Sequence, residues 1–232
     1  EGAVIAIALS SFALAGAQAT TYTVNTSSDS VVTNACENHQ SGCSLRGAIL
    51  AANAHSGDTI VFSINEFCGL NGCALTLASA LPDISAPTSI LGPSRHAIQR
   101  GSSAANFRVF NVTTTGTVNI SDLTIKQGHS SANGGGLQNF NTGTVNVINC
   151  VFQGNLASEG GGIFNNSTGR VNVTNCTFSS NSADKGGGIG SAGGTVNVTN
   201  CTFTGNGADL SGGAIHNIFG TVNVIGSTFN AN

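Results

Sequence analysis

Charged side chains are scarce in this chain of 232 residues. It has 7 Lys and Arg and 10 Asp and Glu, so 7% of its residues are charged, against roughly 25% in an average soluble protein. The formal net charge is −3, and the few basic residues are scattered. Nucleic acids and anionic membranes are bound by clustered Lys and Arg. We therefore expect neither as a partner.

Long apolar runs, Met and Trp are also absent. No stretch of 18 or more apolar residues occurs, so we expect no membrane-spanning helix. In place of charge the chain has 32 Gly and 27 Asn. With 40% apolar residues, it can still bury a core and need not be disordered.

The N-terminal segment predicts export. Residues 3–15 form an apolar run, and residues 17–19 (AQA) have the form of a signal-peptidase site. We interpret residues 1–19 as the remnant of a signal peptide, cleaved after Ala19, which predicts a secreted or cell-surface protein. An N-terminal core helix is the alternative, but it would show polar residues at helical spacing. Because the repeat described next stops in mid-unit at Asn232, we also expect C-terminal truncation.

An internal repeat dominates the second half of the chain. Units that open on Gly-Thr-Val-Asn, or a close variant, recur at spacings of 27, 26, 25 and 26 residues. They begin at Gly116, Gly143, Gly169, Gly194 and Gly220. Within a unit, apolar and polar residues alternate as in a strand, the phase breaks once, and a glycine-rich turn follows. This pattern predicts an all-β fold, a single-stranded right-handed parallel β-helix (a solenoid) over residues 58–232.

Stacking the repeats predicts ladders of equivalent residues about 4.8 Å apart. An inward Val ladder contains Val118, Val145, Val171, Val196 and Val222. An inward, mostly aromatic ladder contains Ile125, Phe152, Phe178, Phe203 and Phe229. An outward ladder contains Asn119, Asn146, Asn172, Asn197 and Asn223. We expect Asn155, Asn181 and Asn206 at turns, because Asn tolerates left-handed backbone.

Residues 20–57 are predicted to form an N-terminal cap segment with a short helix at about 44–54. Its apolar residues at one helical face are Leu45, Ala48, Ile49 and Ala52. Ser44 is a suitable N-cap, and the helix would cover the open core and the unpaired strand edge of the first coil. Gly47 costs about 1 kcal/mol relative to Ala. A Glu at that position would complete a capping box.

Two motifs resemble known families. Residues 43–49 (CSLRGAI), followed by 57–60 (GDTI), resemble the CSLREA motif of secreted bacterial β-helix proteins, with Gly47 in place of Glu. The later units resemble the polymorphic outer membrane protein repeat, whose signatures are GGA-[ILV] and FxxN. Residues 212–215 (GGAI) match the first signature. The FxxN matches begin at Phe152, Phe178, Phe203 and Phe229. The resemblance implies a secreted or surface-displayed β-helix, in some relatives an adhesin, and implies no defined reaction.

The seven cysteines fall into two groups. In an exported chain, the closely spaced pairs Cys36/Cys43 and Cys68/Cys73 predict two local disulfides. Zinc binding by these four is the alternative, although their spacing does not suit it. The remaining three belong to an inward ladder and are predicted to be reduced and buried. That ladder contains Leu123, Cys150, Cys176, Cys201 and Ser227.

Catalytic chemistry has little support in the sequence. Polysaccharide-active β-helix enzymes need clustered carboxylates and a basic residue, but the acids here number about one per repeat. Glu159, Asp184 and Asp209 fall in the same turn, near Lys185, where we interpret them as solvated charges. His216 is not expected to be catalytic. We predict no catalytic, metal-binding or cofactor-binding residues.

Three classes of function remain. The sequence favours a monomeric structural or adhesive module, whose Asn-, Thr- and Ser-rich wall would make polyvalent contacts with glycans or a host or neighbouring cell surface. A polysaccharide lyase or hydrolase is the second class. An ice-binding protein is the third, because Thr and Asn alternate outward in several repeats. Arg170 interrupts that array and argues against a flat ice-binding plane.

Overall fold

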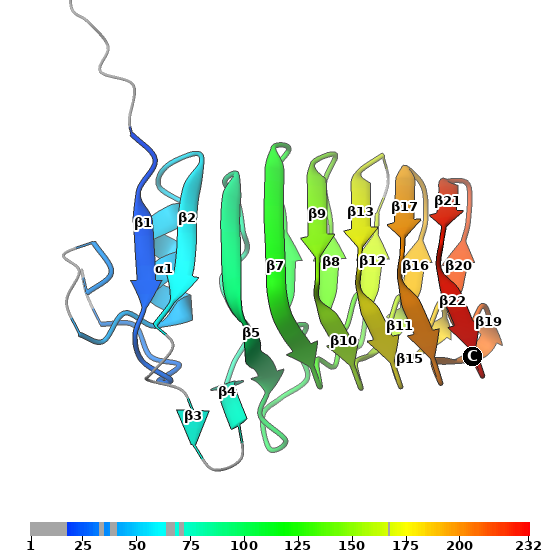
Figure 1. Ribbon diagram of the computed structural model, residues 1–232, viewed down its shortest axis with the longest axis horizontal. Coiled ribbons are helices and arrows are strands. Elements are labelled where there is room, and N and C mark those ends of the chain that lie inside the picture. The colour runs from blue at the N-terminus through cyan, green and yellow to red at the C-terminus, as the bar shows by residue number, and fades with distance from the viewer. Residues whose placement is uncertain (1–17, 33–34, 38–40, 64–67, 70–71, 167) are drawn as a thin grey trace, which may run out of the picture.

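The computed structural model describes residues 18–32, 35–37, 41–63, 68–69, 72–166 and 168–232. It is a parallel β-solenoid of about six turns. Figure 1 shows the coils stacked side by side along the long axis in chain order. Strands of successive coils pair into sheets of 14, 5 and 3 strands. The β-helix predicted from the repeat is confirmed.

The early coils are irregular and contain the longest strands. Their strands are β1 (Thr21–Val24), β2 (Asp58–Phe62), β3 (Cys68–Gly69), β4 (Gly72–Leu77), β5 (Thr88–Arg100), β6 (Phe110–Val112), β7 (Thr117–Lys126) and β8 (Leu137–Asn139). The sheet begins before the expected boundary at residue 58, because β1 pairs with β2 in parallel register. The short strands β3 and β4 pair antiparallel. The expectation that all strands after residue 58 would pair in parallel is therefore wrong for this pair.

The later coils repeat four short strands. One coil contains β9 (Thr144–Ile148), β10 (Val151–Gln153), β11 (Leu156–Glu159) and β12 (Ile163–Asn165). The next contains β13 (Arg170–Thr174), β14 (Thr177–Ser179), β15 (Ser182–Lys185) and β16 (Ile189–Ser191). The last strands are β17 (Thr195–Thr199), β18 (Thr202–Thr204), β19 (Gly207–Ser211), β20 (Ile215–Asn217), β21 (Thr221–Ile225) and β22 (Thr228–Asn230). These strands pair in parallel, with a register shift between β15 and β19.

Left-handed backbone turns the chain at the corners of each coil. In the second regular coil the residues with positive φ are Asn175, Ser180 and Gly186. The first of these lies at the phase break seen in the repeat. The expectation that Asn181 would adopt this conformation is wrong, because the residue before it turns the chain and Asn181 itself is buried.

The side chains at the FxxN asparagines instead form an amide ladder, buried at Asn155, Asn181 and Asn206 and exposed at its last member, Asn232. The Oδ1 atom of Asn181 accepts hydrogen bonds from the backbone N–H (3.1 Å) and the side-chain N–H (2.9 Å) of Asn155. Its own Nδ2 donates to the carbonyl of Phe152 (2.9 Å). Each amide therefore satisfies backbone groups that the corner would otherwise leave unpaired and buried.

The predicted inward ladders form the core of the regular coils, and residues of the cap helix and the early strands extend it. Val118, Val145, Val171 and Val196 are fully buried. The phenylalanine rings of successive coils stack nearly parallel, with centroids 4.7–5.0 Å apart. At the last coil, Phe229 is 46% exposed, because no described strand covers it.

The three cysteines of the inward ladder are free and buried, as predicted. The backbone N–H of Cys150 lies 3.3 Å from Cys176 Sγ, and that of Cys176 lies 3.4 Å from Cys201 Sγ. The thiols therefore fill the core and also accept hydrogen bonds from the chain one coil away.

A short helix covers the N-terminal end of the stack. It is α1 (Leu45–Ala52), within the predicted span, and Ser44 Oγ accepts the N-cap hydrogen bond from the Gly47 N–H at 3.0 Å. Gly47 is thus at the third helical position, as a capping box requires. A Cβ atom at this position would lie 3.2 Å from Cys36 Sγ, a tight contact.

The predicted disulfide between Cys36 and Cys43 is present beneath this helix. In the second pair, the backbone places Cys68 opposite Cys73. Cys73 is disulfide-bonded, while the side chain of Cys68 lies outside the described part of the structure.

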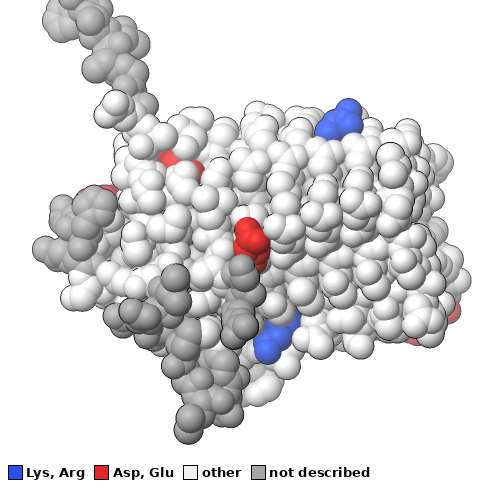
Figure 2. Space-filling model, viewed as in Figure 1, with Lys and Arg blue, Asp and Glu red and all other residues white. Residues whose placement is uncertain are grey.

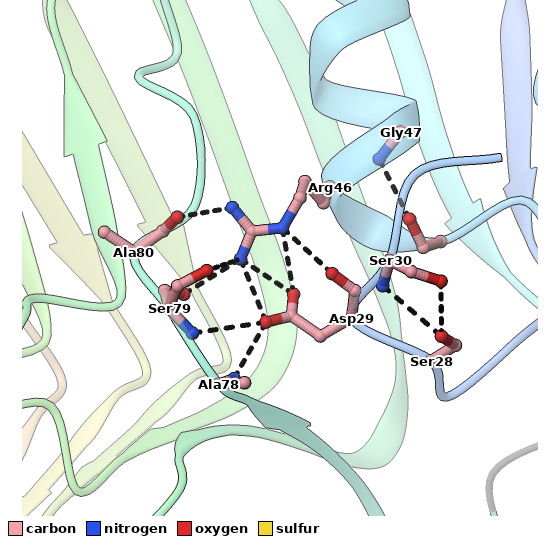
Figure 3. A network of polar contacts seen from close by, with 9 residues as sticks. Ser28, Asp29, Ser30, Arg46, Gly47, Ala78, Ser79 and Ala80 are labelled. Carbon is pink, nitrogen blue, oxygen red and sulfur yellow. Dashed lines mark hydrogen bonds and ion pairs between the residues drawn. The ribbon is translucent and has the colours of Figure 1, made fainter. Parts of the chain in front are cut away.

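Arg46 fastens the helix to two other segments (Figure 3). Its guanidinium forms an ion pair with Asp29 at 2.9 Å and also donates to the carbonyls of Ser79 and Ala80. Asp29 in turn accepts the Ala78 N–H at 2.8 Å. This network joins the cap to the first coils and gives Arg46 a structural role.

Candidate interaction face

One surface of the solenoid carries the repeat's polar pattern. We call the outward side of β9, β13, β17, β21 and the first half of β7 the Asn face. Its central column is Asn119, Asn146, Asn172, Asn197 and Asn223, which the strand register places side by side. Its two flanking columns start at Thr117 and Ser121. The sequence therefore predicted the position of this column correctly.

The central column is a continuous hydrogen-bonded ladder. Each Nδ2 donates to the Oδ1 of the preceding Asn at 2.7–2.8 Å, from Asn223 down to Asn119. Asn119 then donates to Ser89 Oγ at 3.0 Å. The ladder fixes the side chains, and each amide keeps one N–H and one lone pair for an outside partner. The face is thus a rigid row of donors and acceptors.

The Asn face is almost uncharged. Figure 2 shows white surface over most of the region where Figure 1 places these strands. The exception is Arg170, which is exposed and stands in register between Thr144 and Thr195. Long-range charge steering by such a face is weak, so any partner would have to be held by hydrogen bonds and shape.

The three acidic residues predicted to share a turn each have a different local environment. Glu159 forms an ion pair with Lys185 at 3.4 Å, and Asp184 accepts a hydrogen bond from Ser158 at 3.1 Å. Asp209 is exposed on the strand where the register shifts. These carboxylates do not converge, which agrees with their interpretation as solvated charges.

His216 lacks the geometry of an activated base. Its Nδ1 atom lies 3.1 Å from Ser211 Oγ, but its Nε2 atom is buried with no hydrogen-bond partner. A Ser-His catalytic pair needs a third group that orients the imidazole through its other nitrogen. In the described part of the chain, that group is absent at His216.

A cavity that the sequence did not reveal lies among the early coils. Asp83 and Arg108 both line it, and its volume is about 250 Å³. Arg108 donates hydrogen bonds to three neutral partners: the Asn133 carbonyl (3.2 Å), Ser130 Oγ (3.3 Å) and Asn111 Oδ1 (3.4 Å). Burial lowers the pKa of Arg108, and Asp83 opposes that shift. The cavity therefore holds a partly desolvated cation that can accept a carboxylate.

No signal in the sequence located these two residues. Asp83 and Arg108 both precede the recognisable repeats. The register in this region pairs Ile84 with Val112, so the two residues do not occupy equivalent positions of successive coils.

These features identify a repetitive solenoid scaffold. Residues 89–229 match the family described as the right handed beta helix region, and the chain belongs to that family. The match covers more than half of the chain and gives the predicted hand of the helix. No curated protein and no solved structure matches the chain. Within the described residues, no helix is long and apolar enough to cross a membrane.

Proposed function

We propose that this protein is a secreted or surface-displayed, non-catalytic β-helix that makes polyvalent contacts with glycans or cell surfaces through the Asn face. The observation that carries this proposal is the in-register amide ladder from Asn119 to Asn223. It repeats the same donors and acceptors at strand spacing on a rigid support.

Repetition is what makes weak hydrogen bonds useful here. A single exposed hydrogen bond contributes about 1 kcal/mol or less, too little for specific binding. Several identical sites on one rigid face raise the apparent affinity, because each bound unit holds the next at high effective concentration. A polymer with a regular repeat, such as a glycan chain, would use such a face best.

The sequence supports the cellular setting of this proposal. The segment before Thr20 has the pattern of a signal peptide. The CSLREA-like and FxxN motifs resemble those of secreted and surface-displayed bacterial proteins. The disulfide at Cys36 and Cys43 suits an oxidising compartment.

Two matched double variants test the Asn face. Thr144→Glu with Thr195→Glu adds two charges beside the amide ladder, two strands apart. Thr177→Glu with Thr228→Glu adds the same charges at the same spacing on the neighbouring face formed by β14 and β22. Retention on immobilised glycans and on whole cells should fall more than tenfold for the first variant only. Equal retention of both variants would refute the proposal.

The cavity at Arg108 favours a second candidate, a polysaccharide-active enzyme. A guanidinium and a carboxylate that line one cavity could bind a carboxylated sugar and its hydroxyl groups. A screen of acidic glycans with and without calcium tests this alternative. It predicts product formation that Arg108→Gln abolishes, whereas the adhesive proposal predicts no product.

Ice binding remains the third candidate and has less support. The register places Arg170 in the middle of the Thr column of the Asn face, where it breaks the flat array that ice would need. Thermal hysteresis of the purified protein, and its increase in Arg170→Thr, would favour this candidate over glycan binding.

A further inference from the structure

A buried carboxylate meets the chain close to the expected processing site. Asp58 opens β2 and is 0% exposed. Its Oδ1 atom accepts a hydrogen bond of 2.7 Å from the backbone N–H of Thr20, the residue before β1. Figure 1 shows β1 lying directly beside β2, and this contact lies immediately before the first residue of β1.

The neighbours of Asp58 balance its charge poorly. Its Oδ2 atom is buried with no hydrogen-bond partner. His55 Nδ1 lies 3.7 Å from that atom, beyond hydrogen-bonding distance, and its side chain is 53% exposed. Burial and a side-chain hydrogen bond with Asp58 raise the pKa of Tyr22 to about 12. A phenol is neutral or negative, so this contact adds no positive charge beside the carboxylate. A buried carboxylate is costly unless a cation pairs with it.

Cleavage at the predicted site would supply that cation. Hydrolysis of the bond between Ala19 and Thr20 adds water, leaves a carboxylate on Ala19 and frees the amine of Thr20, which takes up a proton. The new ammonium group would stand where the amide N–H now donates. Gln18 and Ala19 are both exposed, so a peptidase could reach the bond.

We propose that Asp58 is a built receptor for the α-ammonium group of Thr20 that signal-peptidase cleavage after Ala19 creates. The ammonium keeps the existing contact with Oδ1 and gains donors that can reach Oδ2. The hydrogen bond that the uncharged N–H now donates to the carboxylate becomes a partly buried ion pair, and β1 is held on β2 more firmly. Processing thereby completes the fold at the N-terminal end of the solenoid.

Three forms of the protein test this proposal. One begins at Thr20 with a free amine, the second is the same chain acetylated at Thr20, and the third retains residues 1–19. Acetylation removes the charge and preserves one N–H, so it is a matched control that needs no substitution. In chemical denaturation, the free-amine form should have an unfolding equilibrium constant at least tenfold smaller than either other form. Equal constants for the free and acetylated chains would overturn the proposal.

Asp58→Asn provides the second arm of the test. In this variant, the difference between the free and acetylated chains should disappear, while the register of β1 on β2 persists in amide exchange. If the free and acetylated chains still differ in stability in Asp58→Asn, the effect of the amine does not depend on Asp58, and the proposal is overturned. The N-terminal residue of the exported protein, determined by mass spectrometry, must be Thr20, and another N-terminus would overturn it as well.

Discussion

Asn172 donates its side-chain N–H to the Oδ1 atom of Asn146 at 2.8 Å, although the two residues are 26 positions apart in the chain. The same bond recurs one coil later between Asn197 and Asn172 at 2.7 Å. A hydrogen bond of this kind forms only when successive coils have the same shape. The repeat length is therefore tied to the side-chain ladder as well as to the backbone.

The buried amide ladder should matter more to stability than the exposed one. Asn181→Ala leaves the backbone N–H of Asn155 and the carbonyl of Phe152 without their partner. We expect a loss of about 2–4 kcal/mol in the free energy of unfolding. The matched change Asn172→Ala, on the half-buried Asn face, should cost about 1 kcal/mol. Equal losses in denaturant titrations would contradict this assignment.

The ion pair between Arg46 and Asp29 should hold the cap in place. Arg46→Ala leaves Asp29 with backbone donors alone, so we expect a loss of about 2–3 kcal/mol. Arg170→Ala is the control, because Arg170 is exposed on the Asn face, and it should change stability by less than about 0.5 kcal/mol. Hydrogen exchange should show the loss of protection concentrated in α1. A uniform loss of protection along the solenoid would show that this ion pair does not stabilise the cap locally.

Gly47→Glu and Gly47→Ala together isolate the capping box. Both variants add a Cβ atom 3.2 Å from Cys36 Sγ, and both remove the helix penalty of Gly. The Glu carboxylate can also return to the backbone N–H of Ser44. Gly47→Glu should therefore be more stable than Gly47→Ala by about 0.5–1 kcal/mol. A melting temperature no higher than that of the Ala variant would refute the capping box.

The thiols of Cys150, Cys176 and Cys201 should not react with alkylating reagents in the folded protein. Hydrogen bonds with the thiols of Cys150 and Cys201, together with burial, raise the pKa of Cys176. The hydrogen bond with Cys176 lowers the pKa of Cys150 and of Cys201. Burial, which all three thiols share, is therefore the reason to expect low reactivity. All three ladder thiols should resist alkylation in native buffer. Three should react after denaturation without reductant, and all seven cysteines after reduction. One reactive thiol, or none, in the unreduced denatured chain would show that the ladder is cross-linked.

The chain's single tyrosine reports on the N-terminal strand through its titration. Tyr22 has a pKa of about 12 in the fold, raised by burial and by Asp58, against about 10 in an unfolded chain. Because the folded pKa is the higher one, the stability that this group contributes is complete below pH 10. It is lost as the pH rises from 10 to 12. Tyrosinate absorbance should give the higher midpoint in native protein, and a midpoint near 10 would contradict the buried environment.

The sequence by itself determined the stacking. A period of 25–27 residues with alternating apolar positions can bury its core only if equivalent residues lie one above another. The Val, Phe, Cys and outward Asn ladders could therefore be identified by alignment alone. The helix at residues 45–52 could also be predicted from the sequence, because its cap residue and apolar face are local features.

Only the tertiary structure decided what happens at corners and between the irregular coils. The period shows which residues stack, but it does not show which way a side chain points where the chain turns. At one such corner, Gly154 has the left-handed backbone that turns the chain, and the side chain of Asn155 is buried. The repeat alone did not distinguish these two roles. The hydrogen bond from Thr20 to Asp58, and the cavity that Asp83 and Arg108 line, bring together segments outside the recognisable repeats. No periodicity links such segments, so their meeting depends on how the early coils and the cap pack in three dimensions.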